Sequence, residues 1–138
     1  DQSSSRGLGD VYKRQIGDHG FSMGLSPLVP ATVGAALLPW LQDWLQNRAV
    51  DFSEIRSWAV HPGGPKILST CAEALGLDPE LLGDSRVVLQ DHGNMSSATI
   101  LFILERLRRR SVAGPCLALA FGPGLSAELA LLDLQITN

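Results

Sequence analysis

Two polar residues, His61 and Asn94, each lie where an apolar run breaks off before an apparent helix. His61 begins the segment 61–66, HPGGPK, and Asn94 lies within the segment 93–98, GNMSSA. Such junctions can place a side chain at the end of a sheet, with a helix N-terminus directed at the same space. An imidazole N–H and a carboxamide NH₂ that converge there would stabilise a developing oxyanion. The sequence therefore predicts a site with two hydrogen-bond donors.

Apolar periodicity predicts the elements that position these two residues. Residues 55–60 form a short apolar strand candidate that ends at His61. A helix is predicted over 66–75, where Gly76 terminates it. A second helix is predicted over 96–110, because four apolar residues recur on one of its faces. These four residues are Ile100, Ile103, Leu104 and Leu107.

The remaining elements complete an alternating pattern of helices and strands. They are a strand end or hairpin over 16–25, a helix over 29–48, a short helix over 78–83, a helical stretch over 86–90 and strands over 115–121 and 126–134. Pro39 is expected to kink the first helix or to split it in two. Asp78 is the expected N-cap of the short helix, and Gly83 its end. This order of elements predicts an α/β fold with a layered sheet.

Composition limits the classes of function. The chain has 138 residues, of which 45% are hydrophobic, enough for one domain with a substantial core. A net charge of −3 gives no electrostatic footprint for nucleic acid. No apolar run is long enough for a membrane span or a signal peptide, so a cytoplasmic protein is expected. Cys71 and Cys116 lie in apolar surroundings without CxxC spacing, which predicts buried thiols and no metal site.

The first fifteen residues differ in character from the rest of the chain. Residues 1–15 are polar and rich in Ser and Gly, without helical or strand periodicity. We predict that they are a disordered, non-native leader. The expected domain then covers residues 16–138.

The two motifs, together with the closing segment 120–126, AFGPGLS, resemble the C-terminal half of a type III polyketide synthase. This is the chalcone and stilbene synthase-like family, which has the thiolase fold. The resemblance runs from about residue 16 to residue 134 and implies a decarboxylating Claisen condensation of coenzyme A thioesters. In that reaction a cysteine thiolate accepts a starter acyl group. Malonyl-CoA then loses carbon dioxide, and the resulting carbanion attacks the enzyme-bound chain.

The resemblance also implies roles for particular residues. His61 and Asn94 match the catalytic histidine and asparagine of the family. The loop that approaches coenzyme A matches Gly63, Gly64, Pro65 and Lys66. Positions that line the active site or shape its elongation cavity match Ser96, Gly122, Pro123 and Gly124. Met23 falls where plant members usually carry a Phe at the pocket gate, so the starter and the chain length are not implied.

The nucleophilic cysteine of the family belongs to an N-terminal half that this sequence does not contain. We therefore expect the chain alone to be inactive. Its expected partners are malonyl-CoA, an acyl-CoA starter, the cysteine-bearing half and, in the intact enzyme, a second copy in a homodimer. Coenzyme A thioesters are expected as substrates, with no tightly bound cofactor and no metal.

Three alternatives remain open at this point. A β-ketoacyl-acyl carrier protein synthase III would also use His and Asn, but its histidine is usually followed by Gln-Ala-Asn. A thiolase would need a second cysteine near the C-terminal glycine loop, and Cys116 lies too early for that role. A non-catalytic half-domain of the thiolase fold is the third alternative.

Overall fold

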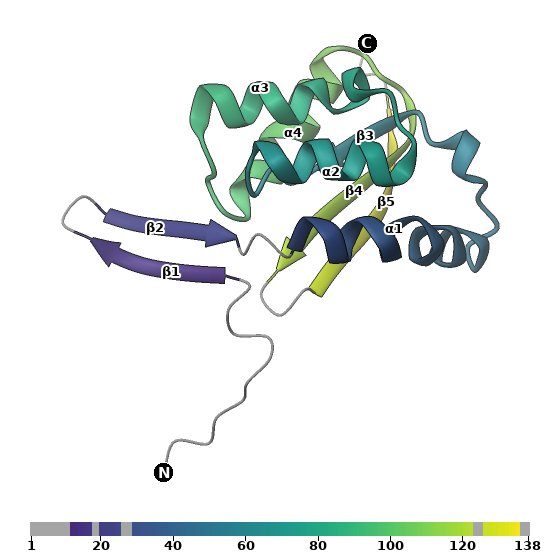
Figure 1. Cartoon of the computed structure of the whole chain (residues 1–138). Helices are drawn as coiled ribbons and strands as arrows, with labels where there is room; N and C mark the ends of the chain where they lie inside the picture. The colour runs from purple at the N-terminus through teal and green to yellow at the C-terminus, as the bar shows by residue number, and fades with distance from the viewer. Residues whose placement is uncertain (1–11, 18–19, 26–28, 123–125, 136–138) are drawn as a thin grey trace.

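The computed structural model describes residues 12–17, 20–25, 29–122 and 126–135, and their side chains from Gly34 onward. The helices and strands follow the chain in the order shown in Figure 1. They are β1 (Tyr12–Gly17), β2 (Gly20–Leu25), α1 (Val29–Gln46), β3 (Ser57–Val60), α2 (Pro65–Leu75), α3 (Gly83–His92), α4 (Ala98–Arg109), β4 (Gly114–Gly122) and β5 (Ser126–Leu134), with short 3₁₀ helices η1 (Phe52–Glu54) and η2 (Pro79–Leu82).

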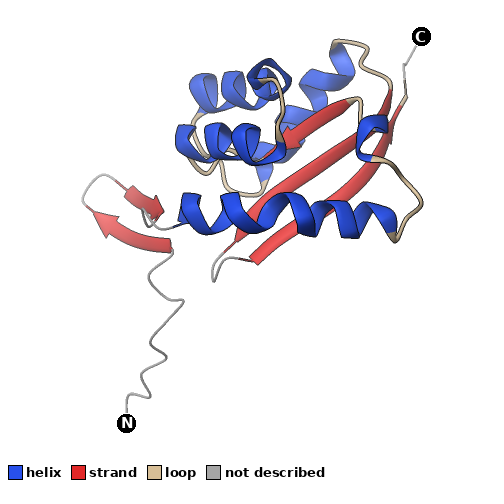
Figure 2. Cartoon of the chain, turned by 45° about the vertical axis from the view of Figure 1, so that its right-hand side comes forward, coloured by secondary structure: helices blue, strands red, loops and turns tan. Residues whose placement is uncertain are grey.

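Strands β3, β4 and β5 form one mixed sheet in that order, as Figure 2 shows. Strand β3 runs parallel to β4, with Val60 opposite Leu119, and β5 returns antiparallel to β4. Strands β1 and β2 pair with each other as a separate antiparallel hairpin. The mixed sheet with helices confirms the predicted layered α/β architecture.

Side-chain alternation along β3 divides the core into two apolar layers. Trp58 and Val60 point to the layer of α1 and α2, whereas Ala59 points to the layer of α3 and α4. All four residues of β3 are buried. The central strand β4 also contributes to both layers, through Leu117 and Leu119 on one face and Cys116 and Ala118 on the other. A strand that is covered on both faces is expected to be largely apolar, as these two are apart from the buried Ser57 of β3.

Helix α1 continues through Pro39 without being split, and its C-terminal end lies close to the predicted one. Pro39 lies on the exposed side of the helix, opposite the buried Leu37 and Leu41. Water can therefore satisfy the backbone carbonyl that loses its hydrogen bond to the proline, and core packing stabilises the helix on both sides of Pro39.

Three predicted boundaries were wrong. Strand β1 begins at Tyr12, earlier than the hairpin predicted over 16–25, while residues 1–11 lie outside the described residues. The division into a leader and a domain stays a prediction. Helix α3 begins at Gly83, earlier than the helical stretch predicted over 86–90, because Gly83 has right-handed helical angles. Asp78 and Gly83 are nevertheless the N-cap and the C-cap of η2, as predicted. The helix predicted to start at Ser96 starts at Ala98, because Ser96 has a positive φ of 57°.

A buried carboxylate ties α3 to the C-terminal end of α4. Asp84 is only 4% exposed, and its two oxygens accept hydrogen bonds from Arg106 at 3.2 Å and Arg110 at 2.6 Å. Glu105 accepts from Arg108 and Arg109 at 2.8 Å each, on the exposed side of α4. The arginines at the C-terminal end of α4 therefore pair with one buried carboxylate, Asp84, and one exposed carboxylate, Glu105.

The substitution Asp84→Asn should lower the free energy of unfolding by about 1–3 kcal/mol, because two charge-assisted hydrogen bonds at a buried position are weakened. Its matched control is Glu105→Gln, which removes an exposed carboxylate with the same number of arginine partners and should change stability little. Urea unfolding of both variants checks this. Equal losses would contradict the account.

Candidate oxyanion site

His61 directly extends strand β3. Its backbone N–H donates to the carbonyl of Leu119 at 2.8 Å, which adds one more rung to the β3–β4 ladder. Alternation along the strand therefore places its side chain on the same face as Ala59, toward α3 and α4. The imidazole is half-buried, and desolvation lowers its pKa below the ordinary value of 6.5. At neutral pH it is an uncharged ring that can donate one N–H.

The loop after His61 leads into the N-terminus of α2. Gly63 donates its N–H to the His61 carbonyl at 3.1 Å, and Gly64 is the N-cap residue in an extended conformation. Pro65 occupies the first turn of α2, where its missing N–H costs nothing. Lys66 is exposed beside it. A Cβ added at Gly64 would meet no atom within 4 Å, so the chain itself leaves open space in front of this helix N-terminus.

Asn94 lies in the loop between α3 and α4. Its side-chain oxygen accepts a hydrogen bond from the backbone N–H of Ser96 at 2.9 Å, which forms an Asx turn. A backbone N–H can only donate, so the atom that faces it must be the oxygen. The carboxamide NH₂ of Asn94 is consequently the group left to face outward. Asn94 is exposed, as an oxyanion donor must be to reach a substrate.

Alternation along β3 and the packing of Met95 both indicate that His61 and Asn94 lie toward the layer of α3 and α4. Met95, next to Asn94, packs into the apolar cluster that contains Ala59, two residues before His61. Among the described residues, no hydrogen bond joins the His61 and Asn94 side chains. The two donors thus share a layer while each keeps a free N–H.

The structure describes the predicted pocket residues less completely than His61 and Asn94. Met23 lies in β2 opposite Arg14, but its side chain is outside the described set. Ser96 is exposed in the same loop as Asn94. Gly122 ends β4 opposite Ser126, and an added Cβ there would come within 2.6 Å of the Ser126 hydroxyl. Pro123 and Gly124 lie outside the described residues.

The thiols of Cys71 and Cys116 are buried, as predicted, and unsuited to nucleophilic attack. Burial raises the pKa of Cys71 to about 12 and also raises the pKa of Cys116. Neither thiol forms a thiolate readily at neutral pH. In the part of the chain that the structure describes, no cluster of His, Cys, Asp or Glu could hold a metal ion. That same part contains no helix of the length and apolarity that a membrane span requires.

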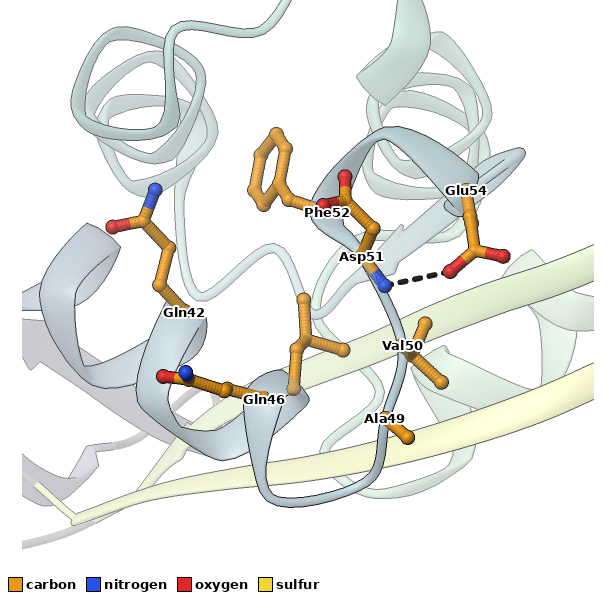
Figure 3. Close-up of a pocket in the computed structure, with 8 residues that line it drawn as sticks. Gln42, Gln46, Ala49, Val50, Asp51, Phe52 and Glu54 are labelled. Atoms are coloured by element: carbon orange, nitrogen blue, oxygen red, sulfur yellow. Dashed lines mark hydrogen bonds between the residues drawn. The ribbon is translucent and has the colours of Figure 1, made fainter.

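Sequence reasoning did not find the surface hollow at the C-terminal end of α1, which Figure 3 shows. Its volume is about 620 Å³, and its lining includes Gln42, Gln46 and Phe52. Asp51 and Glu54, also in its wall, form a reciprocal capping box around η1. Both carboxylates therefore accept hydrogen bonds from backbone N–H groups of the capping box itself. A smaller hollow of about 260 Å³ lies between α3 and α4, and neither hollow includes His61 or Asn94.

The sequence and the fold of the chain correspond to a known protein family. The family model for chalcone and stilbene synthases, C-terminal domain, matches residues 7–135. The chain belongs to this family, and its fold is that of the thiolase-like type III polyketide synthases.

Curated relatives include bacterial polyketide synthases. The chain is 32% identical over 123 residues to the alpha-pyrone synthesis polyketide synthase-like Pks18 of Mycobacterium tuberculosis, covering 86% of this chain and 31% of the relative. It is 36% identical over 129 residues to a putative chalcone synthase of Bacillus subtilis, covering 91% and 35%. The chain therefore spans about a third of the length of these relatives.

Solved structures show the same relationship. The crystal structure of PKS-I from the brown alga Ectocarpus siliculosus matches with a TM-score of 0.81 and 28% identity, covering 94% of this chain and 37% of that one. The 1,3,6,8-tetrahydroxynaphthalene synthase of Streptomyces coelicolor, a bacterial type III polyketide synthase, matches with a TM-score of 0.77 and 32% identity, covering 94% and 38%.

The lowered pKa of His61 predicts a pH dependence of stability. The unfolded state binds a proton at this residue below the ordinary pKa of 6.5, whereas the folded state resists it. The free energy of unfolding should therefore fall as the pH drops through 6.5. Thermal unfolding between about pH 7.5 and 5.5 checks this. The variant His61→Gln should lose part of the fall, and His92→Gln, at an exposed position, should retain it. An unchanged fall in His61→Gln would be evidence against the inferred burial.

Proposed function

We propose that this chain supplies the oxyanion-stabilising half of a type III polyketide synthase. The reaction is the decarboxylative Claisen condensation of malonyl-CoA onto an acyl-CoA starter. One observation carries the proposal. The half-buried imidazole after β3 has a lowered pKa, the Asn94 carboxamide oxygen accepts the Ser96 N–H, and Ala59 and Met95 beside these two residues pack in one layer.

The chemistry requires donors of this kind. When malonyl-CoA decarboxylates, the bond between its α-carbon and its carboxylate breaks and carbon dioxide leaves. The electron pair stays on the α-carbon and spreads onto the thioester oxygen as an enolate. The His61 N–H and the Asn94 NH₂ stabilise this oxygen. The α-carbon then bonds to the acyl carbon of the starter thioester and displaces a cysteine thiolate.

The lowered pKa of His61 supports this role. An imidazolium near an acidic carboxylate would form an ion pair with malonyl-CoA and hold it in the ground state. An uncharged ring instead interacts most strongly with the oxygen as its negative charge grows, which lowers the barrier. The half-buried setting of His61 also strengthens the hydrogen bond that its ring donates, because water competes less.

The coenzyme A moiety is assigned to the loop before α2. The open space in front of Gly64, the exposed ammonium of Lys66 and the N-terminus of an eleven-residue helix together suit an anionic or amide-rich ligand. Met23, Ser96 and the segment 122–124 are proposed to line the acyl pocket. The starter itself is not specified by these residues.

The nucleophile is assigned to a cysteine-bearing N-terminal half, because burial raises the pKa of both thiols described here and neither forms a thiolate readily. The surface of α4 supports such a partner. Leu101 is 64% exposed and Phe102 is 45% exposed, and the Phe102 ring contacts His92 of α3. We further propose that the complete enzyme is a cytoplasmic homodimer and that the chain alone is inactive.

In the full-length synthase, His61→Ala and Asn94→Ala should each lower malonyl-CoA decarboxylation by about 10²–10³-fold, because each removes one oxyanion donor. Release of carbon dioxide from malonyl-CoA measures this directly. The matched control is His92→Ala, an exposed histidine of α3, which should keep the full rate. Wild-type rates in His61→Ala or Asn94→Ala, with the fold intact, would refute the site.

Gly64→Ser should raise the KM for malonyl-CoA while leaving the unfolding temperature nearly unchanged. Serine is at least as good an N-cap as glycine, and the new Cβ meets no atom of this chain. Any loss of binding therefore reports a ligand in the open space. Gly83→Ser is the control, because Gly83 also has open space and a negative φ but lies away from the site. An unaltered KM in Gly64→Ser would remove the coenzyme A assignment.

A further inference from the structure

The loop that carries Asn94 is held by one buried hydroxyl. Thr99 is fully buried in the first turn of α4, and its Oγ1 accepts the backbone N–H of Met95 at 2.8 Å. Its own backbone N–H donates to the Ser96 carbonyl at 3.2 Å. Thr99 therefore binds both the residue after Asn94 and the residue whose N–H Asn94 accepts.

This loop needs such support, because its backbone is unfavourable. Gly93 has a φ of 71° with a ψ of −166°, a combination that a glycine adopts without strain because it has no Cβ. Ser96 has a φ of 57°, in the left-handed region that costs a residue other than glycine. A strained conformation persists only where surrounding contacts over-determine it. The two hydrogen bonds of Thr99 are contacts of this kind.

The strained loop fixes the direction of the Asn94 carboxamide. Ser96 can donate its N–H to the Asn94 oxygen only while the loop keeps the Asx turn. If the turn relaxed, the side-chain amide could rotate, and the NH₂ would lose its fixed outward direction. A small misplacement of a catalytic group costs a large factor in rate.

We propose that Thr99 is a positioning residue, which acts through Asn94 by pinning the 93–97 loop so that the carboxamide NH₂ faces the oxyanion. This inference rests on the proposed function, because it assigns a support to one of its two donors. Thr99 makes no contact with the substrate in this role. It lowers the barrier only by keeping Asn94 in place.

The test uses the full-length synthase and the release of carbon dioxide from malonyl-CoA. Thr99→Val keeps the side-chain shape but removes the acceptor, and should lower kcat about 10–100-fold with KM nearly unchanged. Thr99→Ala also lacks the hydroxyl and places no extra methyl group against the Met95 N–H, so it should lose rate as well. Thr99→Ser keeps the hydroxyl and should retain most of the rate. Thr70→Val, on α2, controls for the same exchange elsewhere and should be neutral.

A double-mutant cycle separates positioning from general stability. Because Thr99 acts through Asn94, Thr99→Val should cause no further loss of rate in an Asn94→Ala background. Independent, multiplicative losses would overturn the proposal, as would a wild-type rate in Thr99→Val or Thr99→Ala. If Asn94→Ala itself keeps the full rate, the proposed function fails first. If Asn94→Ala is impaired and the Thr99 variants are not, only this inference fails.

Discussion

Parallel pairing of β3 with β4 is the constraint on which the rest of the structure depends. The pairing buries all four residues of β3 and sends alternate side chains into two separate layers. It also fixes His61 at the end of the strand, because the hydrogen bond to Leu119 extends the same ladder. A shift of one residue in this register would send the imidazole to the opposite layer, away from the loop that carries Asn94.

The layer of α3 and α4 provides the second half of the site. Val88, Ile103 and Leu107 pack these helices onto the face that Ala59 and Ala118 share. The buried Asp84 joins the far ends of the same two helices through Arg106 and Arg110. Helix α4 is thus fixed at both ends, by Asp84 at its C-terminus and by Thr99 at its N-terminus. The short loop between the helices can then hold an unfavourable backbone at Ser96.

Much of this arrangement could be predicted from the sequence. In α4 and β5 one face is more buried than the other, so the apolar residues recur in the sequence with the period of a helix or of a strand. The ends of α2 could also be predicted, because proline favours the first turn of a helix and glycine the left-handed position after its last turn. His61 and Asn94 could be selected as catalytic candidates because both interrupt apolar runs in motifs that resemble a known family.

Other features could not be predicted, because they depend on contacts between distant residues. Nothing local to Asp84 indicates that Arg106 and Arg110 will neutralise it in a buried position. The start of α3 at Gly83, the C-cap of η2, has no local signal, because its right-handed angles differ from the left-handed ones that a glycine at a helix end commonly adopts. The proposed role of Thr99 could not be predicted for a similar reason. A threonine early in a helix is common, and nothing in the sequence indicates that its hydroxyl accepts the Met95 N–H.

The central claim is that His61 and Asn94 converge on one oxygen, and a crystal structure of the full-length synthase with a non-hydrolysable malonyl-CoA analogue tests it most directly. The account predicts that a ring nitrogen of His61 and the side-chain nitrogen of Asn94 both lie about 3 Å from the thioester oxygen of the analogue. An analogue whose thioester oxygen contacts neither residue, or only one of them, would contradict it.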